Sequence, residues 1–270
     1  KSSHLEQSGS LYQALIRPVE RFITTGKIIF VAHGALHYLP FSTLYDGKSY
    51  LIERYSIRML PSASVIKYLR ANTIEHPLDI LILGNPDLGD PRFDLAYAQN
   101  ESLAIAKLYS RSKILLRKDA TEQAFERLAQ NFRYIHFAAH GEFDPDMPMR
   151  SALLLAKDGN NDGRLTLGRL YNMKLNANLV TLSACETGLG KIASGDDVVG
   201  LTRGFLYAGT RSIVASLWKV DDLATSQLMI SFYTFLGTMN TCEALRSAQL
   251  ETLKRFPHPY FWGSFQLVGN

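Results

Sequence analysis

The chain has 270 residues, of which 46% are hydrophobic and 20% are charged, as is typical of a globular protein with a sizeable core. The net charge of +4 comes from 29 basic and 25 acidic residues that form no long run of one sign, so we expect no nucleic-acid partner. No stretch is long and apolar enough to span a membrane, and no apolar signal core is present. Cys185 and Cys242 cannot form a disulfide framework. We therefore expect a cytoplasmic protein with free thiols.

The N-terminal part of the sequence predicts a small half of its own. Residues 1–10 are polar and do not begin with Met, so we expect a linker from a missing upstream region. Residues 11–75 are expected to form an N-terminal half that contains no cysteine, and residues 76–270 the half that contains both. Residues 27–32 form a continuous apolar run, which predicts a buried strand.

Strands and helices alternate along the chain. Apolar runs bounded by turn residues predict strands at residues 27–32, 55–60, 79–83, 113–116, 134–139, 179–184, 212–218 and 261–268, of which the last closes the sheet. Apolar residues at helical spacing predict helices at residues 11–23, 62–69, 98–109, 122–130, 198–207, 223–236 and 243–256. A hairpin is expected around the Asn, Asp and Gly residues at 157–163. This alternation indicates a mostly parallel sheet with helices on both faces.

Two of these strands end in residues that can do chemistry. One is followed by His140-Gly141, and the other delivers Cys185 to a turn that contains Gly188. Loops at the carboxyl ends of parallel strands share one edge of the sheet, where ligands bind. Cysteine catalysis needs a thiolate, a base and donors for an oxyanion, and His140 with Cys185 could supply the first two. From spacing alone, a strand-end histidine and a core cysteine fit equally well.

The other candidates favour structural roles or fail. His136 is expected to be a hydrogen-bonded core histidine, and Cys242, in the first turn of a helix, a structural cysteine. The sequence around Gly188 and Gly190 lacks the first glycine and the Ser/Thr of a phosphate-binding loop. The loop at Asp158 places Arg169 where a calcium site needs Glu, and there is no HExxH or GxSxG motif. We therefore expect no metal and no cofactor.

The sequence resembles the CHAT peptidases, which are caspase-like, separase-related proteins often joined to TPR repeats. The resemblance extends over nearly the whole chain, and its motifs are specific. They are Leu-His-Tyr-Leu-Pro-Phe-Ser-Thr-Leu at 36–44, Gly-Asn-Pro at 84–86, Ile-His-Phe-Ala-Ala-His-Gly at 135–141, Leu-Ser-Ala-Cys-Glu-Thr-Gly at 182–188 and Val-Ala-Ser-Leu-Trp-Lys-Val-Asp-Asp-Leu-Ala-Thr at 214–225.

The resemblance implies a fold and an activity. The fold would be a caspase-like three-layer α/β/α arrangement with a mostly parallel sheet, preceded by a smaller N-terminal pseudo-caspase-like half. Cys185 would be the nucleophile of a cysteine endopeptidase and His140 its base and later acid, with the N–H groups of Gly141 and Cys185 as the oxyanion hole. The strand at 215–218 would line the substrate groove, and a bound peptide would add to it as an extra strand.

The resemblance also implies the residues that bind the substrate and the partners. Side chains expected near the substrate are Glu186, Asp196, Asp197, Ser216, Leu217, Trp218, Asp221 and Asp222. An acidic residue among them could meet a basic P1 side chain, although Asp221 and Asp222 could instead cap a helix. A P1 aspartate would need an arginine, and Arg150 and Arg203 are available. The partners would be a protein substrate and an upstream TPR-type or sensor domain that regulates the peptidase, as in bacterial defence proteins, and no membrane. The alternative is a non-catalytic scaffold that binds peptides.

Overall fold

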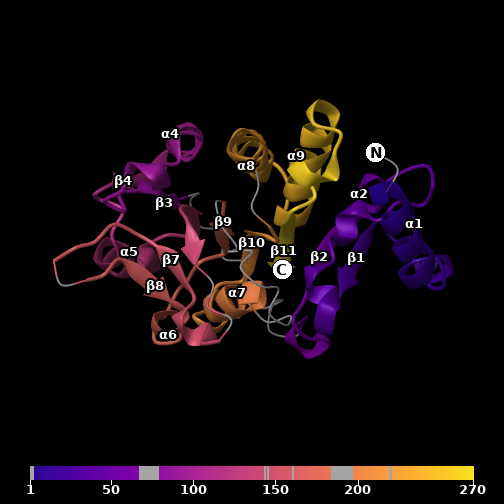
Figure 1. Cartoon of the computed structure of the whole chain (residues 1–270), viewed down its shortest axis with the longest axis horizontal. Helices are drawn as coiled ribbons and strands as arrows, with labels where there is room; N and C mark the ends of the chain where they lie inside the picture. Colours follow the sequence, from indigo (N-terminus) through magenta and orange to yellow (C-terminus); the bar gives the residue numbers. More distant parts are fainter. Residues whose placement is uncertain are drawn as a thin grey trace.

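One eight-stranded sheet extends through the molecule (Figure 1). The computed structural model describes residues 3–66, 79–142, 144, 146–159, 161–183, 197–218 and 221–270. The strands lie in the order β1 (Lys27–Phe30), β2 (Ser56–Met59), β11 (Phe265–Gly269), β10 (Ser212–Ser216), β9 (Leu179–Leu182), β5 (Tyr134–Ala138), β3 (Asp79–Pro86) and β4 (Arg111–Arg117). Neighbours are parallel except β10 and β11, which are antiparallel.

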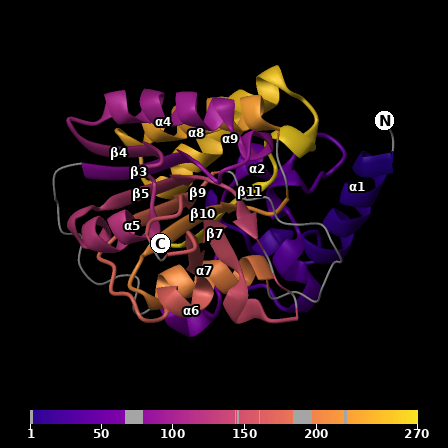
Figure 2. The same ribbon diagram turned by 60° about the vertical axis from the view of Figure 1, so that its left-hand side comes forward.

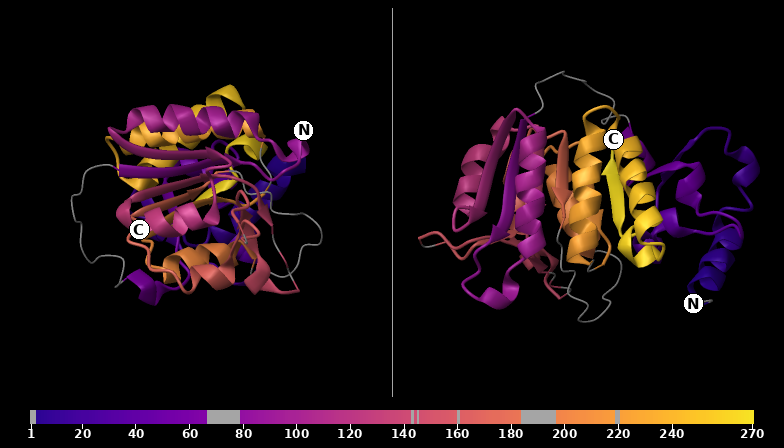
Figure 3. Two further views of the ribbon diagram at one scale, coloured as in Figure 1. Left: turned by 90° about the vertical axis from the view of Figure 1, so that its left-hand side faces the viewer. Right: turned by 90° about the horizontal axis from the view of Figure 1, so that it is seen from above.

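Helices cover both faces of this sheet. One face carries α4 (Ala96–Leu108), α8 (Asp222–Leu236) and α9 (Thr241–Arg255), which lie side by side in Figures 2 and 3. The other face carries α5 (Glu122–Leu128), α6 (Leu167–Leu170) and α7 (Asp197–Tyr207). Each interface has its own apolar core, because strands buried on both faces present apolar side chains in both directions. The expected α/β/α fold with a mostly parallel sheet is therefore confirmed.

The expected hairpin is part of a small second sheet, which is formed by the chain segment that connects β5 to β9. It consists of β6 (Gly141–Glu142), β7 (Ala152–Leu154) and β8 (Arg164–Thr166), all antiparallel. Gly163 has a φ of 78°, and a Cβ there would lie 2.4 Å from the Leu155 carbonyl oxygen. The turn into β8 therefore requires glycine.

The N-terminal residues build a third core at the end of the sheet. They include α1 (Ser3–Leu15), α2 (Leu51–Arg54) and the strands β1 and β2. The side chains that form this core are Tyr12, Ile16, Ala32, Phe41, Leu44, Leu51 and Met59. The linker expected at residues 1–10 is helical from Ser3 onward, because Tyr12 and Ile16 anchor α1 on this core. The boundary expected near residue 75 lies in residues 67–78, outside the described residues.

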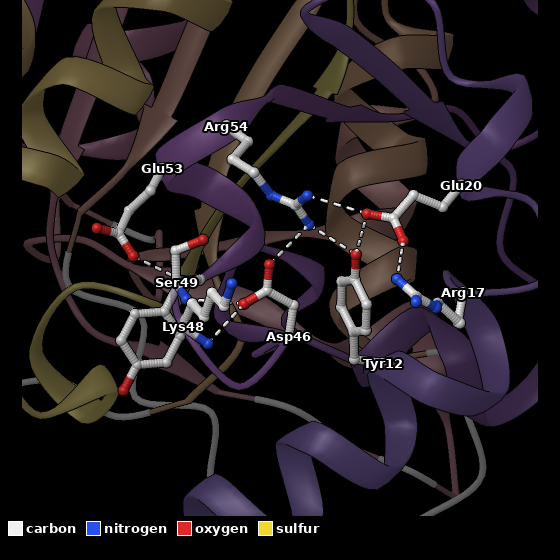
Figure 4. Close-up of polar contacts among 9 residues, drawn as sticks. Tyr12, Arg17, Glu20, Asp46, Lys48, Ser49, Glu53 and Arg54 are labelled. Carbon is white, nitrogen blue, oxygen red and sulfur yellow. Dashed lines mark hydrogen bonds and ion pairs between the residues drawn. The ribbon is translucent and has the colours of Figure 1, made fainter.

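A polar cluster fixes α1 to the rest of this part (Figure 4). Arg54 of α2 donates a hydrogen bond to Tyr12 Oη over 2.6 Å and to Glu20 Oε1 over 2.9 Å. Asp46 lies 3.4 Å from the same guanidinium. The mutual contacts hold the pKa of Glu20 below its usual range, chiefly through the hydrogen bond from Tyr12. One arginine thus connects α2 to Tyr12 and Glu20, which lie 42 and 34 residues earlier in the chain.

Short 3-10 turns link these elements. They lie at Glu20–Phe22, Gly34–Tyr38, Phe41–Thr43, Ala63–Val65, Pro91–Phe93, Ala129–Asn131, Pro148–Arg150 and Pro259–Phe261. Thr121, Asp221 and Asn240 are the N-caps of α5, α8 and α9, since each side chain accepts a hydrogen bond from a first-turn N–H group. No helix in the described ranges is long and apolar enough to cross a membrane.

Two expectations about the sheet are wrong. The last strand does not close the sheet but lies inside it, because β11 pairs with β10 on one side and with β2 on the other. The strand at 27–32 is not buried: β1 is an edge strand, and Ile29 and Val31 are 38% and 49% exposed. An apolar run shows that a strand forms, but only the strand order decides whether it is covered.

Candidate active site

The carboxyl ends of β5 and β9 meet at one edge of the sheet, as expected. The two strands are parallel neighbours with Phe137 opposite Leu182, and the Ser183 N–H donates to the Phe137 carbonyl over 2.8 Å. His140 follows β5 by two residues. Cys185 lies two residues beyond Ser183 and, with Glu186 and Asp196, outside the described residues. The topology therefore brings the two chain segments that carry the predicted dyad to the same edge.

A backbone carbonyl orients the His140 ring. Nε2 of His140 lies 2.9 Å from the carbonyl oxygen of Phe93, and the two rings meet edge to face with centroids 5.8 Å apart. Because a carbonyl oxygen can only accept, Nε2 carries the proton of this hydrogen bond. In a neutral ring Nδ1 is then the basic nitrogen. Sequence reasoning missed Phe93, because its contribution is a main-chain atom that no side-chain pattern reveals.

Two acidic residues begin α8 beside this histidine. Asp221 is the N-cap, and its Oδ1 accepts from the Ala224 N–H over 2.9 Å, which is the capping role left open by the sequence. Asp222 is half-buried, and its Oδ2 accepts from the Tyr97 N–H over 3.3 Å. Burial raises the pKa of Asp222, whereas the Tyr97 N–H and the attraction of His140 act in the opposite direction. Asp222 is thus the acidic residue that shares the surroundings of His140.

The segment expected to line a substrate groove follows β10. Ser216 is buried at the end of β10, whose two edges are already paired with β9 and β11. The Leu217 N–H donates to the Ser264 carbonyl over 2.9 Å, and Trp218 Nε1 donates to the Tyr260 carbonyl over 3.1 Å. Both edges of β10 are therefore paired from Ser212 to Ala215, and strand addition is limited to groups from Ser216 onward. Asp197 begins α7, and its side chain lies outside the description.

Gly141 offers a backbone N–H near His140. The Leu154 N–H donates to the His140 carbonyl over 2.8 Å, so His140 and Leu154 form a hydrogen-bonded antiparallel pair. Hydrogen-bonded pairs alternate with non-hydrogen-bonded pairs along an antiparallel ladder. The neighbouring pair, Gly141 and Leu153, is therefore a non-hydrogen-bonded pair. The Gly141 N–H therefore points away from β7.

A cavity of about 50 Å³ lies beside Leu217. Thr202 and Arg203 of α7 line it, together with His37 and Pro61 from the N-terminal part. Arg150 lies elsewhere, in the 3-10 turn before β7. Of the two arginines named for a P1 aspartate, Arg203 is therefore the one close to the end of β10.

Behind this edge lies a buried polar network. Glu101 Oε1 accepts from Ser183 Oγ over 2.5 Å and lies 2.7 Å from His136 Nε2. His136 Nδ1 is 3.2 Å from the Tyr233 hydroxyl, which donates to Thr181 Oγ1 over 2.9 Å. All five side chains are at most 1% exposed. His136 is thus the hydrogen-bonded core histidine that the sequence indicates.

Glu101 was missed by the sequence reasoning, although a signal exists. It lies on α4 in the same stripe as Ala98 and Ile105, which is the buried face of the helix. A charged residue in an apolar stripe needs a buried partner, because an isolated buried charge is costly. Which partner it has could not be read from the sequence, since His136 and Ser183 lie 35 and 82 residues away.

Cys242 has the structural character expected of it. It lies in the first turn of α9, and its Sγ is 3.5 Å from the Ile57 carbonyl oxygen. Burial raises the pKa of the Cys242 thiol to about 11. Desolvation therefore outweighs the nearby positive charges of Arg58, Lys27 and Arg246, which act to lower this pKa.

Comparison with known proteins decides the family. The model of the CHAT domain matches residues 5–270. The chain belongs to the CHAT domain family. Among curated proteins, this CHAT domain is similar to tetratricopeptide repeat protein 28 of Homo sapiens, at 25% identity, and to its counterpart of Mus musculus, at 24% identity. Each alignment covers 97% of this chain and 13% of the relative, so the chain spans about an eighth of the relatives' length.

Solved structures show the same fold as this CHAT domain. Separase in the Saccharomyces cerevisiae separase–securin complex aligns with a TM-score of 0.55 and 15% identity, over 86% of this chain and 15% of that chain. The Arg-specific cysteine proteinase gingipain R aligns with a TM-score of 0.57 and 10% identity, over 98% of this chain and 66% of that chain. The CHAT domain therefore has the caspase-like fold of these two proteins.

Proposed function

We propose that this CHAT domain is a cysteine endopeptidase in which Cys185 is the nucleophile and His140 the general base. The observation that carries the proposal is the hydrogen bond from His140 Nε2 to the Phe93 carbonyl, at the edge where β9 leads to Cys185. A base oriented by a third group beside a nucleophile is the arrangement that nucleophilic catalysis requires.

The proposed reaction has two steps. His140 Nδ1 takes the proton of the Cys185 thiol, and the thiolate attacks the peptide carbonyl to form a carbon–sulfur bond. The resulting oxyanion accepts hydrogen bonds from the N–H groups of Gly141 and Cys185, each worth about 3 kcal/mol of barrier. The imidazolium gives its proton to the leaving amine as the carbon–nitrogen bond breaks. Water, deprotonated by His140, then hydrolyses the thioester and restores the thiol.

The geometry supports two parts of this reaction. The Gly141 N–H points away from β7, as an oxyanion donor beside His140 must. Asp222 shares the surroundings of His140 and stabilises the imidazolium that forms during the reaction. The phenyl ring of Phe93 contacts the His140 ring edge to face, with centroids 5.8 Å apart.

The substrate in this proposal is a protein with a basic P1 side chain. Asp222, whose half-buried carboxylate interacts with His140, is the acidic residue that would meet this side chain, and Glu186, Asp196 and Asp197 belong to the segment that leads from β9 to the start of α7. Leu217 and Trp218 contribute apolar surface and main-chain groups for the peptide. Because the curated relatives are tetratricopeptide repeat proteins, we further propose that an upstream TPR-type domain controls access to the site.

A peptide library tests the proposal. Wild type, Cys185→Ala and His140→Gln are incubated with a mixed library, and the products are identified by mass spectrometry. Only the wild type should cleave, after Lys or Arg, and Asp222→Asn should reduce that preference. Equal cleavage by wild type and Cys185→Ala excludes the assignment. No cleavage, together with a Cys185 that iodoacetamide labels no faster than Cys242, indicates the peptide-binding scaffold instead.

A further inference from the structure

Asn85 and Arg117 are the two non-glycine residues with positive φ in the described part of the chain. Their φ angles are 46° and 52°, and they lie beside each other where β3 and β4 end. The register shifts there, from Gly84 opposite Leu116 to Pro86 opposite Arg117, so Asn85 is the extra residue of a bulge. Bulges occur next to active sites, where they redirect a side chain, and backbone strain is kept where the surroundings compensate for it.

The bulge turns the Asn85 side chain toward the loop that follows. Asn85 is 4% exposed, and its Oδ1 accepts from the Leu95 N–H over 2.8 Å. Its neighbour Arg117 donates from Nη1 to Asp94 Oδ1 over 2.6 Å and to the Asn85 carbonyl over 3.4 Å, and Nη2 lies 3.7 Å from Asp87. Both ends of the loop at residues 87–95 are therefore attached to the end of β3 and β4.

This loop carries the carbonyl that contacts His140. Phe93 directly precedes Asp94 and Leu95, the two residues that Arg117 and Asn85 hold. A carbonyl at a loop position keeps a hydrogen-bond distance only if the main chain on its flank is fixed. The other side chains that accept from the main chain of this loop, Asp87 and Asp90, are only partly buried, at 25% and 31% exposed.

We propose that Asn85 is a positioning residue that, assisted by Arg117, holds the Phe93 carbonyl against His140 Nε2 and thereby favours the thiolate of Cys185. The inference rests on the proposed function in one respect, that His140 is the base for Cys185. A fixed acceptor for Nε2–H stabilises the imidazolium, and the imidazolium stabilises the thiolate. If the acceptor moves, a higher pH is required to form the thiolate.

The test is the pH profile of Cys185 alkylation by iodoacetamide, which needs no knowledge of the substrate. The background is Cys242→Ser, and modification is followed by mass spectrometry. Asn85→Gly keeps the positive φ without strain and removes the acceptor, whereas Asn85→Asp keeps Oδ1. We expect Asn85→Gly to slow alkylation at pH 7 about tenfold and to move the profile to higher pH. Asn85→Asp should restore the wild-type profile.

A matched control separates positioning from general loosening. Asn240→Gly removes a comparable bond, from Glu243 N–H to Asn240 Oδ1 over 3.1 Å, at the start of α9 far along the sheet. It should lower the unfolding midpoint in urea without moving the alkylation profile. If Asn85→Gly does not fold, Asp94→Asn replaces it, since Asp94 is 44% exposed and the change weakens only the contact with Arg117. A smaller shift in the same direction is then expected.

Failure of this inference differs from failure of the proposed function. His140→Gln must itself remove the fast alkylation of Cys185 at pH 7. If the pH profile of His140→Gln equals that of wild type, the dyad is contradicted. If His140→Gln has this effect but folded Asn85→Gly, or Asp94→Asn in its place, reacts like wild type, the dyad stands and the positioning role of Asn85 is refuted. A shift produced equally by Asn240→Gly refutes it too.

Discussion

The hydroxyl of Ser183 donates to Oε1 of Glu101 over 2.5 Å, two residues before the predicted nucleophile. The same carboxylate lies 2.7 Å from His136 Nε2, so one buried side chain of α4 connects the middle of β5 to the residue that follows β9. The strands that carry the two halves of the proposed dyad are thereby linked through side chains as well as through the sheet.

Glu101→Leu should destabilise the fold by about 3–5 kcal/mol, because it leaves the polar groups of His136 and Ser183 buried without their partner. Glu101→Gln should cost less, since its amide oxygen can still accept. Urea unfolding followed by circular dichroism measures both. Glu251→Gln is the control, because Glu251 forms an exposed pair with Arg255 over 3.3 Å that is worth at most about 1 kcal/mol. If Glu101→Leu and Glu101→Gln lowered the free energy of unfolding equally, the hydrogen bonds that Glu101 accepts would have no role in stability.

Cys242 should resist alkylation near neutral pH. Burial raises the pKa of its thiol to about 11, so only a minute fraction is thiolate at pH 7.5. In wild type, iodoacetamide should modify Cys185 first, and Cys242 should react only above pH 10 or after unfolding in urea. Peptide mapping by mass spectrometry distinguishes the two sites. Rapid labelling of Cys242 in the folded protein is the result that would overturn this prediction.

Glu122 should make the fold less stable as pH rises. It is fully buried at the start of α5, and burial raises its pKa to about 7, although Arg169 lies 2.7 Å away and acts to lower it. The ordinary pKa of a glutamate is 4.5, and that of Glu122 in the folded protein is about 7. Between these two pH values the folded state holds a proton that the unfolded state has lost. The free energy of unfolding of wild type should therefore fall across this range relative to Glu122→Gln.

Urea unfolding of both proteins at pH 5 and pH 8 tests this sign. The difference between wild type and Glu122→Gln isolates the contribution of this carboxyl, because all other titrating groups are common to both. Arg169→Gln should steepen the fall, since it removes the charge that favours the ionised carboxylate. Parallel pH dependence in wild type and Glu122→Gln would show that the ion pair offsets the burial.

Arg54→Met should loosen α1 from the N-terminal core. Arg54 is 32% exposed and binds Tyr12, Glu20 and Asp46, so the loss should be about 2 kcal/mol, as for hydrogen bonds to charged groups. Arg17→Met is the control, since Arg17 is 66% exposed and its pair with Glu20 is worth less than about 1 kcal/mol. Hydrogen exchange should show faster exchange of α1 amides in Arg54→Met alone. Unchanged exchange there would assign the anchoring of α1 to its apolar contacts.

The sequence by itself determined the elements and the edge at which the site lies. Apolar periodicity located α4, α5, α7, α8 and α9, because it depends on neighbours within a few residues. The alternation of strands and helices implied a parallel sheet, and His140 and Cys185 then had to follow strands at one edge. The sequence offered Asp222 as a substrate-binding or helix-capping residue, and only the tertiary structure brings it near His140.

The tertiary structure decided everything that depends on partners distant in the chain. It placed β11 inside the sheet, left β1 at the edge and made α1 begin at Ser3. It also selected the Phe93 carbonyl for His140, and Glu101 for His136 and Ser183. A local pattern records which residues seek burial or a hydrogen bond. The partner that meets each need is fixed only when strands and helices pack, since the groups that meet there lie 35 to 82 residues apart.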